Sequence, residues 1–307
     1  MRTLIICLLM AVCIQQTAQG HVRYAQTKYP VVLVHGMLGW DKLLGVVDYF
    51  YGIPQDLQRL GADVHLARVS GLDSSEARGE QLLEQVETIL AITGAAKVHL
   101  IGHSQGAPTS RYVAAVAPHL VASVTSVAGA NHGSQVADFV NDHIDSDGPT
   151  GKLVARVMNA LGDLMNALSQ TSVNKPADIQ ASLASLSTKN THQFNQKYPE
   201  GLPATTCGEG APKLQSGPYY FSVGGTSPFT NLFDAGDYAL ASVHKIVFKD
   251  QESDGLLSRC STHLGKVIRD DYRMNHLDAM NHVFGLRGAN PKPIYRQILN
   301  RLKNLNL

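Results

Sequence analysis

The sequence predicts an α/β fold, in which helices cover both faces of a mostly parallel central sheet. Three observations support this fold class. Short apolar runs alternate with amphipathic segments along the chain, as in repeated strand–helix–strand units. Hydrophobic residues make up 44% of the 307 residues, so the chain can bury a sizeable core. No linker rich in proline or glycine divides the chain, so we expect one domain with insertions.

The expected strands are short and rich in β-branched residues. The first, VVLV, is a continuous apolar run that His35-Gly36 ends, as expected of a buried parallel strand. The expected strands are residues 31–34, 63–67, 97–101, 121–127 and 243–248. Two helices are expected at residues 76–92 and 111–116. The first of these has apolar residues at helical spacing, and Gly94 can end it.

The charge balance argues against several classes of partner. Lysine plus arginine total 26 and aspartate plus glutamate total 25, which leaves a net charge of +1. We therefore expect no nucleic-acid partner and no partner that an acidic tail would attract.

The first twenty residues have the pattern of a secretory signal peptide. Arg2 gives a positive start, residues 4–14 are mostly apolar, and Ala18-Gln19-Gly20 supplies small residues for cleavage. The apolar run is too short to span a bilayer, and no later segment is long and apolar enough to do so. A buried first helix, or a lipid anchor at Cys13, is the alternative. Residues 21–307 are expected to be the mature domain.

Two cysteines remain after residues 1–20. Cys207 and Cys260 are expected to pair, because exported chains meet an oxidising compartment. The bridge would close a loop of about 54 residues and stabilise the fold by roughly 4 kcal/mol in the chain-entropy model. A catalytic thiol is the alternative reading of these residues.

The segment Gly102-His103-Ser104-Gln105-Gly106 carries the sharpest chemical signal. It follows an expected strand and precedes an expected helix, which is the setting of a nucleophile elbow. Such a turn holds its serine in a strained backbone conformation with the hydroxyl exposed. The two glycines have no Cβ, so neighbouring elements can approach closely. We expect Ser104 to be a nucleophile.

A serine hydroxyl needs a base to take its proton, and the base needs an acid to orient it. In α/β-hydrolases these partners follow the serine in the order acid, then histidine. Asp254 precedes Gly255 and follows the strand expected at residues 243–248, where a turn could present a carboxylate. His263, His276 and His282 all lie downstream, and spacing alone does not choose among them.

The developing negative charge of a tetrahedral intermediate needs two backbone N–H donors, an oxyanion hole. One donor should be the amide of Gln105, the residue after the nucleophile. The other should come from the loop after an early strand, and the amide of Met37 in His35-Gly36-Met37 fits. A plain strand-ending turn is the alternative reading of that loop.

Five stretches in combination carry a resemblance to a known family. They are YPVVLVHGMLG at 29–39, the elbow around Ser104, CGEG at 207–210, SDGL at 253–256 and YRMNHLD at 272–278. The chain resembles the secreted bacterial triacylglycerol lipases of the Pseudomonas type, which are foldase-dependent α/β-hydrolases. The likeness extends from about residue 27 to residue 307.

The resemblance implies a role for each matching residue. Ser104 would be the nucleophile, Asp254 the acid and His276 the base. The amides of Met37 and Gln105 would form the oxyanion hole. The same family likeness implies a disulfide between the cysteines at 207 and 260.

The family likeness also implies one structural calcium ion near the catalytic histidine. The matching positions are Asp234, Asp278, His282 and the backbone carbonyl of Leu286. Carboxylate and carbonyl oxygens suit a hard cation. The chain departs from the family at His282, where glutamine is common, but a backbone carbonyl can serve as the ligand there. Solvated surface charges are the alternative reading of the two aspartates.

Residues 145–170 include an amphipathic segment. Its apolar stripe consists of Leu153, Val154, Val157, Met158, Leu161, Leu164, Met165 and Leu168. On the sequence alone this pattern is typical of a helix that faces the core. The resemblance instead implies a lid over the active site, which would open where its apolar face gains burial against lipid.

These observations predict a secreted lipase that hydrolyses triacylglycerols through an acyl-enzyme. A carboxylesterase for short soluble esters shares every catalytic residue and is the alternative. A non-catalytic binding protein with the same fold is a third hypothesis. The expected partners are the lipid–water interface and triacylglycerol. The resemblance adds a membrane-anchored foldase and a two-step route through the periplasm to the extracellular space.

Overall fold

The computed structural model describes most of the chain. The described residues are 23–37, 39, 42–43, 47–169, 183–213, 215, 217–281 and 288–307. The signal peptide predicted over residues 1–20 lies outside this part, as do two of the expected calcium-binding positions, His282 and Leu286.

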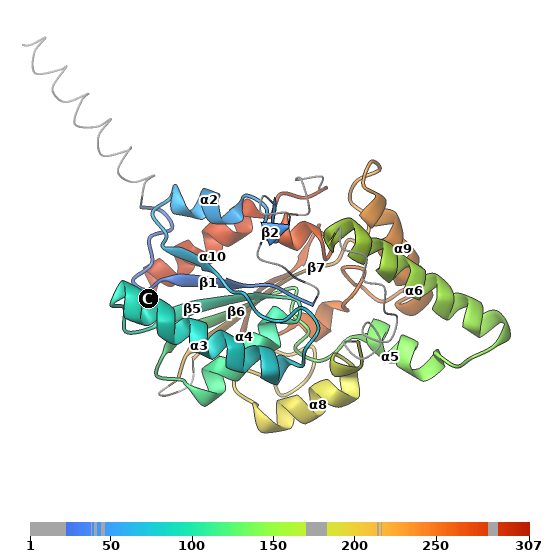
Figure 1. Ribbon diagram of the computed structural model, residues 1–307, viewed down its shortest axis with the longest axis horizontal. Helices are drawn as coiled ribbons and strands as arrows, with labels where there is room; N and C mark the ends of the chain where they lie inside the picture. Colours follow the sequence, from blue (N-terminus) through green and yellow to red (C-terminus); the bar gives the residue numbers. More distant parts are fainter. Residues whose placement is uncertain are drawn as a thin grey trace, which may run out of the picture.

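The described chain is built around a six-stranded sheet in which every neighbouring pair is parallel (Figure 1). The strands, in their order across the sheet, are β4 (Val64–Leu66), β1 (Val31–Val34), β5 (Val98–His103), β6 (Val121–Val127), β7 (Tyr219–Gly225) and β8 (Lys266–Tyr272). A separate antiparallel hairpin joins β2 (Lys42–Leu43) to β3 (Val47–Asp48). The parallel sheet agrees with the fold class that the sequence predicts.

Helices cover both faces of this sheet. They are α2 (Ile53–Gln58), α3 (Ser75–Thr93), α4 (Gly106–Val116), α5 (Gln135–His143), α6 (Gly148–Ser169), α8 (Thr188–Lys197), α9 (Ala235–Val247) and α10 (Lys292–Asn304), with short 3₁₀ turns η1 (Arg259–Thr262) and η2 (Asp278–Met280). Helix α3 begins where Ser74 caps the amide of Ala77 and ends at Gly94, whose φ is +67°. The predicted end of this helix is confirmed.

The core lies in two layers, one on each face of the sheet. Along β1, Val31 and Leu33 belong to the layer that includes α2 and α10. Val32 and Val34 belong to the opposite layer, which includes α3 and α4. Side chains of a strand alternate between its two faces, so an unbroken apolar run is what a strand buried on both faces requires.

The strand predicted over residues 243–248 is wrong, because this segment belongs to helix α9 and its cap. Leu240 and Val243 are both fully buried and lie three residues apart, as on one face of a helix. A short apolar run does not by itself distinguish a strand from a buried helix. The two strands that complete the sheet, β7 and β8, are absent from the prediction. Strand β8 is polar at four of its seven positions because it lies at the edge of the sheet.

The register of the sheet brings two loops together. Val34, at the end of β1, pairs with Gly102 near the end of β5. Parallel strands end on the same edge, so the loop that begins at His35 and the turn that contains Ser104 leave the sheet side by side. This edge is where an α/β sheet places its ligand sites.

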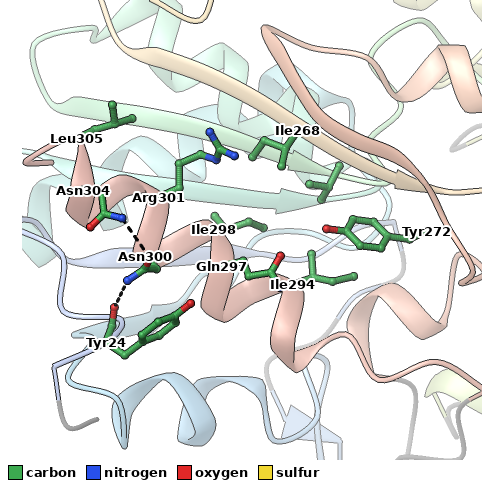
Figure 2. A pocket seen from close by; sticks show the side chains of 11 residues that line it. Tyr24, Ile268, Tyr272, Ile294, Gln297, Ile298, Asn300, Arg301, Asn304 and Leu305 are labelled. Atoms are coloured by element: carbon green, nitrogen blue, oxygen red, sulfur yellow. Dashed lines mark hydrogen bonds between the residues drawn. The ribbon is translucent and has the colours of Figure 1, made fainter. Parts of the chain in front are cut away.

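A groove of about 400 Å³ lies elsewhere, between α10 and the edge strand β8 (Figure 2). Ile268 of the strand and Ile294 of the helix line it, with Tyr24 and Tyr272 among its other walls. None of the predicted site residues lines this groove.

Candidate active site

Ser104 occupies a tight turn between β5 and α4. Its φ of +56° is in the left-handed region, which is rare for a residue with a side chain. A Cβ on Gly102 would lie 2.2 Å from the Gly106 carbonyl oxygen, and a Cβ on Gly106 would lie 2.2 Å from the Val34 carbonyl oxygen. Both positions therefore require glycine, because the strand, the turn and β1 are in direct contact. The turn has the backbone strain that the sequence motif predicts.

His276 and Asp254 form a buried pair. The two atoms His276 Nδ1 and Asp254 Oδ2 lie 2.7 Å apart, and both side chains are almost completely buried. The other carboxylate oxygen, Oδ1, accepts the backbone N–H groups of Leu256 and Leu257, at 2.9 and 2.8 Å. The His276 amide also donates to the Asp254 carbonyl oxygen, at 3.0 Å. The carboxylate is thus held in one orientation toward the imidazole.

The three histidines that spacing leaves open have different surroundings. His263 lies between the carboxylate of Asp270 and the carbonyl of Gly208, each 2.9 Å from a ring nitrogen. His282 lies outside the described residues. Of the two of these histidines that the structure describes, His276 is the one paired with Asp254.

Ser104 and His276 line one small cavity of about 50 Å³, together with Met37. Most of its other walls are apolar, and Leu161 of α6 is among them. A serine, a histidine and the loop expected to hold an amide donor therefore meet at one point. The amphipathic helix α6 contributes directly to the wall of that cavity.

The loop after β1 lies directly against the serine. A Cβ on Gly36 would lie 2.7 Å from the Cβ of Ser104. Gln105 follows the serine at the start of α4 and is fully buried. The structure thus places the Met37 loop and Gln105, the two expected sources of oxyanion donors, next to Ser104.

Arg78 links these two segments, and the sequence prediction does not include it. This fully buried guanidinium donates from Nη1 to the side-chain oxygen of Gln105 at 2.9 Å and to the carbonyl of Gly36 at 3.1 Å. Its Nη2 donates to the carbonyl of His35 at 2.5 Å. Burial lowers the pKa of Arg78 to about 10, so it stays charged at neutral pH. The sequence does contain a signal for Arg78. It lies one helical turn before Leu82, so this charged residue occupies the apolar stripe of α3.

A second set of hydrogen bonds links the loop to the histidine. The Gly36 amide donates to the Tyr49 hydroxyl at 3.2 Å, and that hydroxyl lies 2.8 Å from His103 Nδ1. His103 Nε2 lies 3.0 Å from the backbone carbonyl of His276. A carbonyl can only accept, so Nε2 carries the proton and Nδ1 accepts from the tyrosine. Burial holds the pKa of His103 well below its usual value, so the ring is neutral.

Comparison with known proteins identifies the family. A family model described as the alpha/beta hydrolase fold matches residues 29–250. A triacylglycerol lipase of Vibrio cholerae is 51% identical over 287 residues, which covers 92% of this chain and 90% of the relative. A triacylglycerol lipase of Burkholderia plantarii is 42% identical and covers 91% of this chain and 87% of its own length. The chain belongs to the bacterial triacylglycerol lipase family.

Solved structures share the fold of this family member at lower identity. Lipase 1 of Pelosinus fermentans superposes with a TM-score of 0.63 at 16% identity, covering 92% of this chain and all of its own. A mature lipase of Bacillus licheniformis gives 0.60 at 20% identity, covering 89% and 92%. These similarities support the α/β-hydrolase fold.

The two described aspartates of the expected calcium site are buried, so neither is a solvated surface charge. Asp234 caps α9 by accepting the amide of Gly236 at 2.8 Å. Asp278 accepts the Thr230 hydroxyl at 2.8 Å and the amide of Asn275 at 3.0 Å through one oxygen. Burial raises the pKa of Asp278, and the neighbouring acid Asp237 raises it further.

This acidic region suits a hard cation in part. Asp237 and Asp278 form no ion pair with a described lysine or arginine. Among the described residues, no cationic side chain therefore balances these two acids. Within the described ranges, no cluster of three or more histidine, cysteine, aspartate or glutamate side chains has metal-binding geometry. Two of the four expected positions lie outside those ranges.

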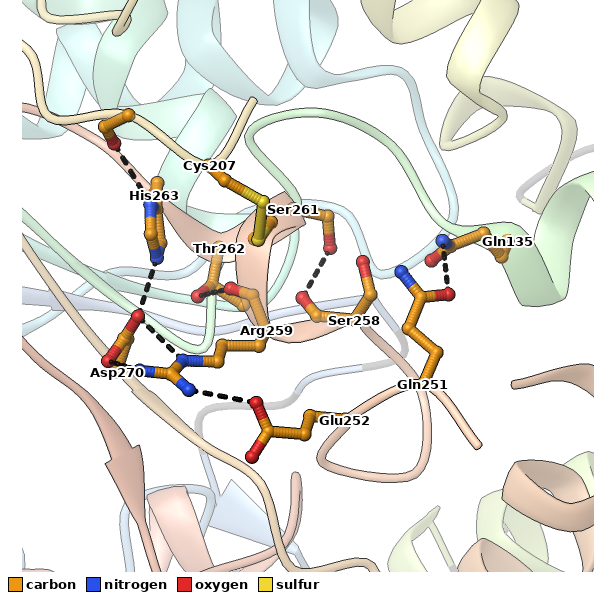
Figure 3. The surroundings of a disulfide bond; sticks show 12 residues. Gln135, Cys207, Gln251, Glu252, Ser258, Arg259, Ser261, Thr262, His263 and Asp270 are labelled. Carbon is orange, nitrogen blue, oxygen red and sulfur yellow. Dashed lines mark hydrogen bonds and ion pairs between the residues drawn. A yellow bond between two sulfur atoms is a disulfide. The ribbon is translucent and has the colours of Figure 1, made fainter. Parts of the chain in front are cut away.

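Cys207 and Cys260 form a disulfide with a Cα–Cα separation of 4.6 Å (Figure 3). Arg259, beside the second cysteine, donates to both carboxylate oxygens of Asp270 at 2.8 and 2.9 Å and to Glu252 at 2.8 Å. These bonds fasten the segment that contains Asp254 to the edge strand β8. The disulfide therefore adds a covalent tie close to the acid of the buried pair.

No helix among the described residues is long and apolar enough to cross a membrane.

Proposed function

We propose that this protein is a secreted lipase that hydrolyses triacylglycerols through Ser104, His276 and Asp254. One observation carries the proposal. Ser104, in a left-handed turn, lines the same largely apolar cavity as His276. The Nδ1 atom of that histidine is hydrogen-bonded to the buried carboxylate of Asp254. This is the arrangement that activates a hydroxyl for acyl transfer.

The reaction follows from these positions. The Ser104 oxygen attacks the ester carbonyl carbon while Nε2 of His276 takes the hydroxyl proton. Asp254 accepts the Nδ1–H bond, which keeps the imidazole in the correct tautomer and stabilises its charged form. The bond to the alcohol then breaks, and the alcohol leaves with the proton from His276.

The second half of the reaction repeats these roles with water. His276 takes a proton from water, the hydroxyl attacks the acyl-enzyme, and the fatty acid leaves as Ser104 regains its proton. In both halves the carbonyl oxygen becomes an oxyanion between the amides of Met37 and Gln105. Arg78 donates hydrogen bonds to the carbonyls of His35 and Gly36. Because the N–H of a trans peptide points opposite to its C=O, the amide of Met37 is directed away from Arg78.

We propose that residues 145–170 act as a lid. Val154 and Val157 of α6 are buried, and Leu161 lines the cavity beside Ser104. A cavity of about 50 Å³ has no room for a long acyl chain, so α6 has to move before such a substrate binds. A lipid surface would favour that movement, because the apolar face gains burial of about 25 cal/mol per Å².

The same small cavity favours a second candidate function. With α6 in place, an esterase for short soluble substrates needs less rearrangement than a lipase. Initial rates on emulsified long-chain triacylglycerol and on a soluble short-chain ester distinguish the two. We expect a rate that rises once the substrate passes its solubility limit. Activity confined to dissolved short esters would support the esterase instead.

The same assays test whether the chain is catalytic at all. We expect Ser104→Ala to lose activity by about 10⁴-fold or more. If the folded wild-type protein hydrolyses no ester, the enzyme hypothesis fails and a non-catalytic binding protein replaces it.

We also propose a calcium ion bound by Asp234, Asp278 and backbone oxygens at His282 and Leu286. The burial of both carboxylates supports it, because carboxylate oxygens suit a hard cation. Asp278 is two residues from His276, so the ion would stabilise the segment that bears the base.

Export completes the proposal. Residues 1–20 would direct the chain through the periplasm to the extracellular space, and a membrane-anchored foldase would assist folding. Support comes from the leader pattern and the family resemblance. Expression with and without a candidate foldase tests this dependence, and full activity after unaided refolding would contradict it.

A further inference from the structure

An exposed apolar tip precedes helix α9. The side chains of Leu232 and Phe233 are 68% and 91% exposed, and Tyr238, in the first turns of the helix, is 53% exposed. We call these three residues the α9 tip. A soluble protein gains nothing in water from a phenylalanine exposed to this extent, and clustered exposed apolar residues mark an interaction surface.

The α9 tip is held in place by hydrogen bonds. The Tyr238 hydroxyl donates to the carbonyl of Leu232 at 3.0 Å, and the Phe233 amide donates to the side chain of Asn231 at 3.0 Å. The ring of Phe229 packs edge-on against Tyr238 with 5.0 Å between centroids. The outward direction of the two apolar side chains is therefore part of an ordered turn, which reduces the entropy lost on binding.

A groove of about 900 Å³ continues this surface between α6 and α9, which lie side by side in Figure 1. Tyr238 lines it from α9 and the half-exposed Leu153 from α6, so the tip and the groove are contiguous. Three cations, Arg156, Lys245 and Lys249, also line the groove. None of the three forms an ion pair with a described carboxylate.

Apolar side chains beside cations that have no ion-pair partner among the described residues are the features of a surface that binds anionic lipid. Such an interface collects negative charge as fatty acids are released, so the cations would face carboxylates while the apolar residues enter the acyl layer. The α9 tip is exposed even while α6 packs against α9 and contributes Leu161 to the wall of the Ser104 cavity. Binding at the tip therefore needs no prior movement of α6.

We propose that the α9 tip is an anchor for anionic lipid surfaces, distinct from the lid, with the three groove cations facing the lipid headgroups. This proposal rests on the proposed function in one respect: a lipase is a protein that meets lipid surfaces. The anchor would bring the chain to the interface first, and α6 would open there afterwards.

The test compares Leu232→Ser/Phe233→Ser with Ile92→Ser, a matched control at the end of α3, where Ile92 is 77% exposed. Partition onto vesicles of phosphatidylcholine containing oleic acid is measured by sedimentation. We expect the double variant to bind at least about tenfold more weakly and the control to bind as wild type does. Equal binding by all three proteins would overturn the proposal.

Two further measurements separate the anchor from catalysis and from charge. Hydrolysis of a dissolved short-chain ester should be the same in all three proteins, and vesicle binding is read without any turnover. An inactive wild type would therefore overturn the proposed function and leave the anchor standing. Lys245→Gln/Lys249→Gln should lose more binding to oleate-containing vesicles than to pure phosphatidylcholine. If the variant loses the same factor of binding, relative to wild type, on both kinds of vesicle, the cations are removed from the proposal.

The variant Phe233→Trp reports insertion of the α9 tip directly. Its tryptophan fluorescence should shift to the blue when vesicles are added. Ile92→Trp serves as the control and should show no shift. A tryptophan at position 233 that stays in a water-like environment on vesicles would contradict insertion at the tip.

Discussion

The ring of His103 lies 4.7 Å from the ring of His276, measured between centroids, and its Nε2 donates to the His276 backbone carbonyl over 3.0 Å. The residue before the proposed nucleophile thus holds the backbone of the proposed base. Through Tyr49 the same histidine is connected to the amide of Gly36 in the loop after β1. Three separate segments of the site are joined by these buried bonds, and each bond predicts an effect on the reaction.

Tyr49→Phe should lower kcat about tenfold and leave KM nearly unchanged. The substitution keeps the ring but leaves the Gly36 amide and His103 Nδ1 without their partner, and a buried unpaired group costs about 1–3 kcal/mol. Kinetics on a soluble ester measure the effect. Tyr24→Phe, at an exposed tyrosine, should behave as wild type. A change in KM alone would show that Tyr49 acts on substrate binding instead.

Arg78→Lys should lower kcat by ten- to a hundredfold. An ammonium group has no planar fork and does not reach His35, Gly36 and Gln105 together, so the loop and the elbow lose their common partner. Arg59→Lys, at an exposed site, is the matched control. Urea denaturation checks that the variant is folded. Unchanged kcat in a folded variant would mean that the guanidinium is only structural.

Stability should fall as the pH drops from about 6.5 to about 4. Burial lowers the pKa of His35 and of His99 to about 4, whereas the unfolded chain takes up these protons near 6.5. The unfolded state therefore binds more protons in this window, so stability is full above 6.5 and decreases below it. Each histidine contributes about 3 kcal/mol at most.

Urea denaturation at several pH values measures this dependence. His99→Gln should show a shallower loss, because the proton that His99 takes up on unfolding is no longer bound. Ile92→Ser, a substitution at a distant exposed site, should keep the wild-type slope. A stability that is constant or rises between pH 6.5 and 4 would contradict the assignment of neutral buried histidines.

Calcium removal should lower the thermal midpoint of the wild-type protein. At calcium a hundredfold above its Kd, the loss on chelation should be about 5 °C or more. Asp234→Asn should reduce this response, and Asp250→Asn, at an exposed acid, should retain it. The measurement does not depend on activity. An identical midpoint with and without chelator would argue against the proposed ion.

Local sequence determined the elbow and the fold class. The turn at Ser104 needs only a strand, two glycines and a helix start within a few residues, so its pattern can be recognised without knowing distant contacts. The alternation of apolar runs likewise predicts a parallel sheet, even though the run at 243–248 is a helix and strands β7 and β8 are not recognised.

Tertiary structure decided the features that depend on distant partners. The pairing of Asp254 with His276 rather than His263, and the contacts of Arg78 and His103, join residues 22 to 173 positions apart. Residue spacing does not encode such distances, because the path of the chain between them is set by packing of the whole sheet. A buried charge or a neutral histidine acquires its role only when that packing removes water and leaves one partner within reach.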